Sequence, residues 1–156
     1  MATSYDNISP DLVWECCRNQ NAFLCKRKQA GGVQFSRDPL NLVNKHSRKY
    51  AGFVNDTAIG IQRDDNTVKL ITKLQKRKNQ PAKMYHESSF SASTPSRKVY
   101  KSVVNSTAKK GYRADLRAEA VARASAVKLS QRERKEKARP VKLRGAKARK
   151  AAEASS

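Results

Sequence analysis

The chain of 156 residues carries 34 lysine and arginine side chains against 13 aspartates and glutamates, for a formal net charge of +21. Hydrophobic residues make up 38% and aromatic residues 6%, so only part of the chain can form a core. No segment approaches the roughly 20 consecutive apolar residues of a membrane span, and residues 1–25 lack the apolar run of a secretory signal. These features disfavour a membrane or secreted protein and predict a polyanionic partner.

The charge is concentrated in the second half of the chain. Residues 1–65 hold nine basic and seven acidic side chains, whereas residues 66–156 hold 25 basic and six acidic ones. The first half therefore resembles an ordinary soluble domain and the second half a polyanion binder. Nucleic acid is the favoured polyanion, because each phosphate that is neutralised releases condensed counterions.

A short helix is predicted to follow a flexible leader at residues 1–8. Ser9 can cap this helix, Pro10 suits its first position, and Asp11 suits its first turn. Its apolar surface is broad for its length, so we expect a sheet to cover it. The chain has three cysteines, Cys16, Cys17 and Cys25, in or soon after this helix. They are too few and too close for a disulfide framework, and they lack the spacing of a zinc site. We therefore expect them to be reduced thiols of a cytosolic or nuclear protein.

Two β-hairpins are predicted in the first half. Residues 21–28 and 33–36 alternate loosely and flank the turn-forming "QAGG". The clearer hairpin spans 57–74 with "RDDN" as its turn, and its core-facing positions are Thr57, Ile59, Ile61, Val68, Leu70, Thr72 and Leu74. Lys69 and Lys73 point the other way, so we expect that sheet face to meet solvent or phosphate.

The two hairpins are joined by "RDPLNLVNKHSRKY", where Asp38 precedes Pro39. This pair predicts a very short helix or an ordered loop. The adjacent Asp64 and Asp65 could suggest an acid pair or a metal site, but neighbours in a turn are more simply read as solvated turn formers.

A polar linker is predicted over 77–93, followed by a helix over 94–110. Thr94 can cap this helix, Pro95 suits its first position, and Gly111 lies just past its end. Its apolar stripe is Val99, Tyr100, Val103, Val104 and Thr107, and its opposite side carries Arg97, Lys98, Lys101 and Lys109. We expect the stripe to dock on the sheet and the cations to point outward.

The stretch "GYRADLRAEAVARASAVKLSQRERKEKARP" (111–140) predicts a second helix with little apolar surface. Its narrow seam is Leu116, Ala120, Ala124 and Val127, and the adjacent face carries Arg117, Lys128, Arg132 and Lys135. We expect the seam to pack on protein and phosphate to neutralise the cations. The resulting organisation is an N-terminal α+β domain at 9–76, a helical region at 94–137 and a basic tail at 138–156.

The sequence offers no catalytic constellation. His46 and His86 lie in polar loop sequence, "QAGGVQ" lacks the Lys and Ser/Thr of a phosphate-binding P-loop, and no serine or cysteine has a nucleophile context. We therefore expect neither an enzyme nor a bound cofactor or metal ion.

Two kinds of nucleic acid could be the partner. Basic residues are spread over predicted strands, linker, helices and tail, which suits folded RNA contacted through phosphate and 2′-OH groups. A protein that reads DNA more often concentrates its charge on one recognition element. A chromatin protein or an accessory to a nucleic-acid enzyme remains the alternative, and it would prefer DNA to RNA.

Four segments resemble the eukaryotic large-subunit ribosomal protein 28 family in order and spacing. They are "DLVWECCRNQNAFLCKR", "DPLNLVNKHSRKYAGF", "TAIGI" and "GYRADLRAEAVARASAV", and the resemblance covers roughly residues 9–135. The chain departs from the family at Ala114, where family members carry a proline. This change should soften the start of the second helix without altering its face.

The resemblance implies a structural protein of the cytosolic large ribosomal subunit with an α+β fold: a small N-terminal antiparallel sheet, a short helix, and two C-terminal helices that extend over RNA. Its partners would be large-subunit rRNA and neighbouring ribosomal proteins, with no membrane, no small-molecule substrate and no homo-oligomer. Transit through the nucleolus during assembly is also implied. A nucleolar assembly factor with a similar N-terminal domain is the alternative, but it is longer, with an acidic C-terminal region and a cysteine-rich insertion that this chain lacks.

Charge and helical face, with one aromatic neighbour, predict the residues that contact rRNA. They are Lys26, Arg27, Lys45, His46, Arg48, Lys49, Lys76, Arg77, Lys78, Arg97, Lys101, Lys109, Lys110, Tyr112, Arg113, Arg117, Arg123, Lys128, Arg132, Arg134 and Lys135.

Overall fold

The computed structural model describes residues 8–29, 31–132 and 144–154, and the predicted leader at residues 1–8 lies outside them except for its last residue. The described chain is an α+β fold, as the sequence predicts. Its strands are β1 (Leu24–Lys26), β2 (Gln34–Ser36), β3 (Ile59–Asp64), β4 (Thr67–Lys73) and β5 (Tyr85–Phe90), and its α-helices are α1 (Pro10–Cys17), α2 (Ser96–Ser106), α3 (Arg117–Ser130) and α4 (Ala146–Glu153). Short 3-10 helices are η1 (Gln75–Arg77), η2 (Pro81–Lys83), η3 (Ala108–Lys110) and η4 (Ala114–Leu116).

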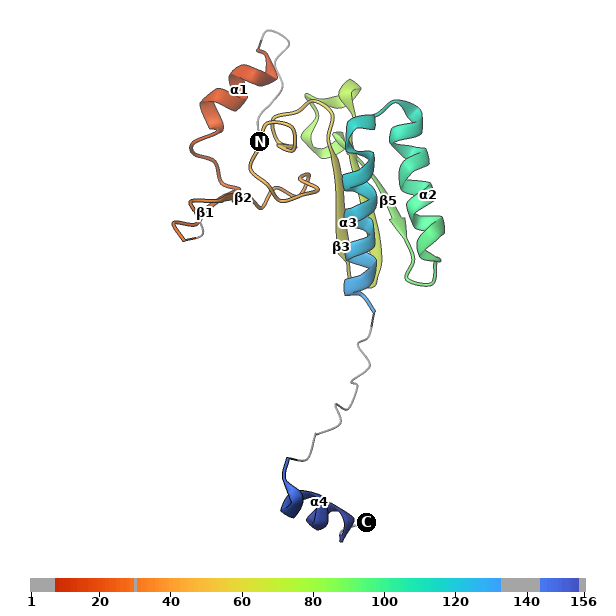
Figure 1. The fold of residues 1–156 in the computed structure, drawn as a ribbon. Coiled ribbons are helices and arrows are strands. Elements are labelled where there is room, and N and C mark those ends of the chain that lie inside the picture. Colours follow the sequence, from red (N-terminus) through yellow and green to blue (C-terminus); the bar gives the residue numbers. More distant parts are fainter. Residues whose placement is uncertain (1–7, 30, 133–143, 155–156) are drawn as a thin grey trace.

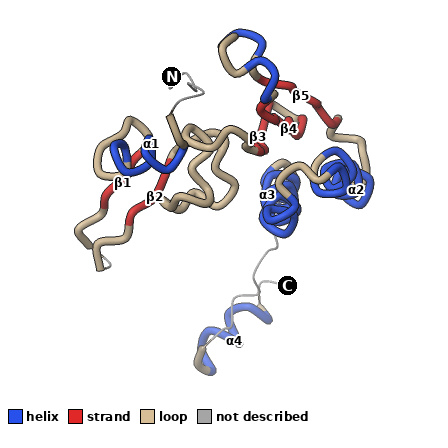
Figure 2. The backbone as a smooth tube through the Cα atoms, turned by 90° about the horizontal axis from the view of Figure 1, so that it is seen from above, coloured by secondary structure: helices blue, strands red, loops and turns tan. Residues whose placement is uncertain are grey.

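The larger sheet is antiparallel, with strand order β3-β4-β5. The β3–β4 hairpin pairs Ile61 with Leu70 and Ile59 with Thr72, which confirms the predicted hairpin and the shared face of these residues. Helices α2 and α3 lie side by side on one face of this sheet, while α1 and the β1–β2 hairpin lie beyond its β3 edge (Figures 1 and 2). The sheet and the two helices therefore form one layered unit.

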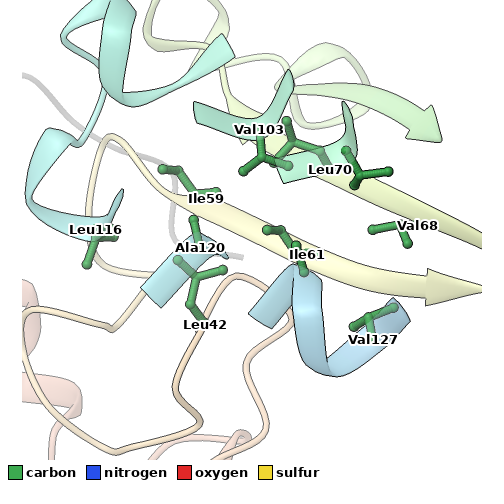
Figure 3. Close-up of a cluster of buried hydrophobic side chains, with 11 residues drawn as sticks. Leu42, Ile59, Ile61, Val68, Leu70, Val103, Leu116, Ala120 and Val127 are labelled. Atoms are coloured by element: carbon green, nitrogen blue, oxygen red, sulfur yellow. The ribbon is translucent and has the colours of Figure 1, made fainter. Parts of the chain in front are cut away.

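The main core lies between the sheet and these two helices (Figure 3). It contains eleven buried residues, in the order of the chain: Leu42, Ile59, Ile61, Val68, Leu70, Val99, Val103, Leu116, Ala120, Ala124 and Val127. The predicted seam of the second C-terminal helix is therefore fully buried, and the predicted stripe of the first supplies two valines. Burying a valine, leucine or isoleucine side chain contributes about 1.5–3 kcal/mol, so this small set holds the fold together.

The opposite face of the sheet is partly covered, so Lys73, contrary to the sequence prediction, does not meet open solvent. Lys73 Nζ donates to the carbonyl oxygens of Gly52 and Asn55 at 2.6 and 2.9 Å. Burial lowers the pKa of Lys73. Lys69 forms ion pairs with carboxylates on both neighbouring strands, each at 3.2 Å. Leu40, from the loop between the two sheets, packs with Ile71 on this face, and both lysines have partners within the protein.

Helix α1 begins as predicted but is not covered by a sheet. Ser9 Oγ accepts a hydrogen bond from Leu12 N at 3.2 Å, and Pro10 is the first helical residue. No residue of α1 is buried, and Leu12 is 56% exposed. The helix is held from one side, where the Trp14 ring lies 4.9 Å from that of His46. The helix packs against the loop between the two sheets instead, where Arg48 Nε donates to Asp11 Oδ1 at 2.8 Å.

The loop between the two sheets is tightly ordered around Asp38. The Asp38 carboxylate is buried and accepts hydrogen bonds from the backbone N–H groups of Leu40 and Phe53, at 2.9 and 3.0 Å. Leu40 packs directly on Gly52 and Gly60, where an added Cβ would lie 2.3 Å and 2.9 Å from its side-chain atoms. The ordered loop predicted at this point is confirmed, and it joins the β1–β2 hairpin firmly to the larger sheet.

The C-terminal half differs from its prediction in three places. The stretch expected to be a linker contains β5, which pairs with β4 along six residues. Helix α2 begins at Ser96 without a side-chain cap from Thr94, and it ends at Ser106; η3 follows, and Gly111 ends η3 with a φ of 73°. Part of the expected extended tail forms α4, which has no buried residue.

Candidate nucleic-acid interface

The solvent side of α2 and η3 carries five exposed cations: Arg97, Lys98, Lys101, Lys109 and Lys110. We call this set the α2 basic face. Spacings of three and four residues place the first three along one side of the helix. Val99 and Val103, on the other side, are completely buried and fix which way the cations point. The prediction that this helix docks by its stripe and turns its charges outward is confirmed.

The α2 basic face has no acidic counterpart nearby in the sequence. No aspartate or glutamate occurs between Glu87 and Asp115. The salt bridges formed within the described ranges involve other residues, such as Lys49 with Glu119 and Arg113 with Asp115. Five like charges on one surface raise a positive potential that attracts polyanions.

The cations of α3 are used differently. Lys128 is only 8% exposed, and its Nζ donates to the carbonyl oxygens of Ala92 and Ser91 at 2.6 and 3.3 Å. Arg123 Nε donates to the Ile61 carbonyl at 3.4 Å. Arg117 and Arg132 are exposed. The single charged face predicted for this helix is therefore divided, with Lys128 committed to the loop before α2.

Tyr112 and Arg113 are also tied into the protein. The Tyr112 hydroxyl donates to the Lys73 carbonyl at 2.8 Å and accepts from Ala58 N at 3.1 Å. Burial raises the pKa of this phenol. Arg113 adopts a left-handed backbone with a φ of 47°, and its guanidinium donates to the Thr57 carbonyl at 2.9 Å. These contacts connect the turn before α3 to the edge of the sheet.

A polar cluster links the loop between the two sheets (residues 37–58, the central loop) to the start of α3. Hydrogen bonding to Arg113 lowers the pKa of Asp115. The pKa of Glu119 is lowered chiefly by its own backbone N–H, and then by the side chains of Lys49 and Tyr50. Lys49 Nζ lies 3.3 Å from Glu119 Oε1, and this bond raises the lysine pKa. Lys49, predicted to contact RNA, thus has a carboxylate partner in the protein.

The N-terminal candidates fall into two groups. Lys26, Arg27 and Lys45 are exposed on or beside the β1–β2 hairpin. His46 Nε2 hydrogen-bonds to the Arg18 carbonyl at 2.7 Å, and Arg48 Nε donates to Asp11 at 2.8 Å. The second group therefore holds α1 against the central loop.

Three of the remaining candidates lie on η1 or directly after it. Lys76 and Arg77 are exposed on η1, and Lys78 is half-buried. Arg134 and Lys135 lie outside the described residues. The structure also exposes cations that the sequence prediction did not include, among them Lys28, Arg37 and Lys98. Their only sequence signal is charge in a polar stretch, which does not distinguish them from cations that fold inward.

Within residues 8–29, 31–132 and 144–154 no helix has both the length and the apolar character to cross a membrane. The same residues bring together no group of three or more histidine, cysteine, aspartate or glutamate side chains suited to a metal ion.

The fold and the surface define a class: a small basic α+β protein with an uncompensated cationic face on a helix that is anchored by its other side. Comparison with known proteins is more specific. The model of the ribosomal L28e protein family matches residues 12–130. The chain belongs to this family.

Relatives from distant eukaryotes are similar along most of the chain. The large ribosomal subunit protein eL28 of Schizosaccharomyces pombe (strain 972 / ATCC 24843) is 42% identical over 131 residues, which cover 83% of this chain and 97% of the relative. The protein of the same name from Dictyostelium discoideum is 34% identical over 131 residues, covering 84% and 95%. That of Caenorhabditis elegans is 39% identical over 85 residues, covering 54% and 64%.

Proposed function

We propose that this protein is a structural constituent of the cytosolic large ribosomal subunit, where it binds and stabilises folded large-subunit rRNA and so supports translation. Family membership supports the ribosomal role, since its relatives are named as large-subunit proteins. The net charge of +21 supports an RNA partner. Contacts would be distributed over many phosphates, as in most recognition of folded RNA.

The α2 basic face is the observation that carries this proposal. Its five cations are exposed, and the 27 residues from Ser88 to Ala114 contain no acidic side chain. Like charges so close together destabilise the free protein unless counter-charges arrive. Phosphates of rRNA would supply those counter-charges. The exposed cations Lys26, Arg27, Lys45, Lys76, Arg77, Arg117 and Arg132 would add contacts around the molecule.

The proposal assigns no catalytic step, cofactor or metal ion to the chain. Other partners would be neighbouring ribosomal proteins, and the protein would pass through the nucleolus before reaching the cytosolic ribosome. The competing role is that of an assembly factor that leaves before the subunit matures. The sedimentation experiment described next separates the two roles.

The test is sedimentation of the tagged full chain from a eukaryotic cell lysate through sucrose at high salt, with the subunits separated by chelating magnesium. A structural constituent stays on the mature cytosolic large subunit at one copy per particle and is released by ribonuclease. Recovery only on nucleolar precursor particles would establish the assembly role instead. Recovery away from ribosomes would contradict both.

A further inference from the structure

The β1–β2 hairpin carries two large apolar side chains that the protein covers only in part. Val33 is 43% exposed and Phe35 is 42% exposed. Most aromatic side chains are largely buried, so a phenylalanine this exposed on a three-residue strand lacks a packing explanation. Phe35 did not appear among the residues predicted to contact RNA.

The hairpin register places cations on the same face as Phe35. Phe35 is paired with Cys25 in the ladder and bridges to Lys45 on its other side. Arg27 N donates to the Val33 carbonyl at 3.3 Å, which continues the ladder by one more pair. Residues directly opposite in antiparallel strands share a face. Arg27, Val33, Phe35 and Lys45 therefore lie on one exposed surface, which we call the hairpin face.

Exposed charge in the segment that carries the hairpin face is of one sign. Residues 16–55 contain eight lysines and arginines and a single carboxylate, Asp38. That carboxylate is 3% exposed and is occupied by the N–H groups of Leu40 and Phe53. An apolar surface flanked by Arg27 and Lys45 suits a partner that is flat and apolar in one part and anionic in another. A nucleotide has this combination, in its base and its phosphate.

We infer that the hairpin face binds an unpaired RNA nucleotide, with the base stacked on the Phe35 ring and the adjoining phosphates contacting Arg27 and Lys45. Aromatic side chains on a β-sheet surface stack on bases that are splayed out of loops or bulges, whereas bases inside a duplex are inaccessible. This inference rests on the proposed RNA-binding function and deepens it. The α2 basic face would bind backbone of any sequence, and the hairpin face would require a single-stranded element.

The test compares two RNAs that carry the same number of phosphates, a blunt duplex and a stem with an oligouridine loop, using fluorescence anisotropy on the purified full chain. Phe35→Ala should weaken binding to the looped RNA by about tenfold, since stacking on one base is worth about that factor. Binding to the duplex should change less than about twofold, and the dependence on salt should be unaltered because no cation is lost.

Three further variants make the test specific. Phe35→Trp should restore binding, because it keeps a flat aromatic ring. Phe35→Leu should behave like the alanine variant while keeping an apolar side chain for the fold, and thermal unfolding checks that it is intact. Leu129→Ala removes the side chain of a residue that is 65% exposed on α3, and it should leave both affinities unchanged.

The outcomes separate this inference from the proposed function. Equal losses on both RNAs would give Phe35 a structural role and overturn the inference. Unchanged RNA affinity with poor incorporation into the large subunit would make the hairpin face a protein contact, which also overturns it. If the unmodified chain bound neither RNA in a salt-dependent manner, the proposed function would fail as well.

Discussion

Helices α2 and α3 pack on the same sheet face, yet they deploy their cations differently. Helix α2 buries two valines and leaves Arg97, Lys98 and Lys101 exposed. Helix α3 packs through small side chains, Ala120 and Ala124 among them, and buries Lys128 at its end. Two neighbouring helices with similar cationic content thus differ: α2 presents its cations to solvent, whereas α3 uses Lys128 to bind another part of the protein.

The difference follows from how closely each helix approaches its neighbours. Alanine at positions 120 and 124 lets the α3 backbone come close to β3, so long cationic side chains at its flanks reach backbone carbonyls. Arg123 reaches Ile61 and Lys128 reaches Ala92 in this way. A lysine satisfied by carbonyls contributes to the fold, whereas one left in solvent remains available for phosphate.

The largest expected effect comes from neutralising the α2 basic face. Glutamine at four of its cations should weaken binding to folded RNA about a thousandfold near 0.15 M salt and lower the log–log salt slope by three to four units, because roughly 0.7–0.9 counterion is released per phosphate contact. Anisotropy titrations at several salt concentrations measure both. The variant is R97Q, K98Q, K101Q and K109Q.

A matched variant removes the same charge from α4 and from Arg144 just before it, through R144Q, K147Q, R149Q and K150Q. If it lowers affinity and slope as strongly as the α2 variant, total charge rather than the α2 basic face governs binding. Circular dichroism should show that both variants keep their fold, since all eight side chains lie outside the buried core.

Lys128→Met should lower the stability of the fold and leave RNA binding unchanged, unlike the α2 variant. Its loss leaves two carbonyl oxygens without their charged donor, so the free energy of unfolding should fall by about 2 kcal/mol. The salt slope for RNA should stay the same. Urea unfolding and anisotropy measure the two quantities, and Lys98→Met is the control, with unchanged stability and a slope lower by about one unit. A slope change for Lys128→Met would show that this lysine leaves its carbonyls to reach RNA.

Tyr112→Phe should lower stability by about 1–1.5 kcal/mol, because the hydroxyl hydrogen-bonds to Ala58 and to Lys73 at the sheet edge. RNA affinity should not change. Thermal and urea unfolding provide the measurement. A selective loss of RNA binding, at normal stability, would instead make this tyrosine an RNA contact.

The smallest effect is expected at Asp115, whose pKa is held below its ordinary value by the hydrogen bond from Arg113. A carboxyl with a depressed pKa in the folded state contributes stability above its unfolded pKa of about 4, and this stability is lost as pH falls through the folded value. The half-exposed pair should be worth only about 0.5 kcal/mol. Asp115→Asn should therefore be slightly less stable than the unmodified chain at pH 7 and equal to it at strongly acidic pH, by urea unfolding.

Several elements could be predicted because their signals are local. Ser9 and Pro10 fix the start of α1, and alternation of apolar residues fixes the β3–β4 hairpin. The seam of α3 follows from residues three and four apart. In each case the residues that determine the element are close together in the sequence.

Strand β5 could not be predicted in this way. Its sequence "YHESSF" has apolar character only at its two ends, and it follows a polar stretch with a proline. Its pairing is supplied by β4, which offers a free edge, and by the burial of Met84 just before it. Tertiary context therefore decided its structure, as is common for strands.

The sequence also could not show which cations are free to contact phosphate. Lys98 and Lys128 are the same residue type in similar helical sequence, but only Lys128 has carbonyl acceptors within reach. Backbone carbonyls of a loop carry no signature in the sequence, so charge and helical face could locate a basic surface without showing which members are free. Phe35 was missed because its exposure depends on how the hairpin is paired.

The close packing of Leu40 against Gly52 and Gly60 has a consequence for how the protein meets a partner. With Asp38 fixed by two backbone N–H groups, the chain leaving β2 is clamped within four residues of the hairpin. The hairpin is thus held in a defined direction relative to the layered unit before any partner arrives. Less conformational entropy is then lost on association, so two separate contact surfaces can engage one partner at the same time with a smaller ordering penalty.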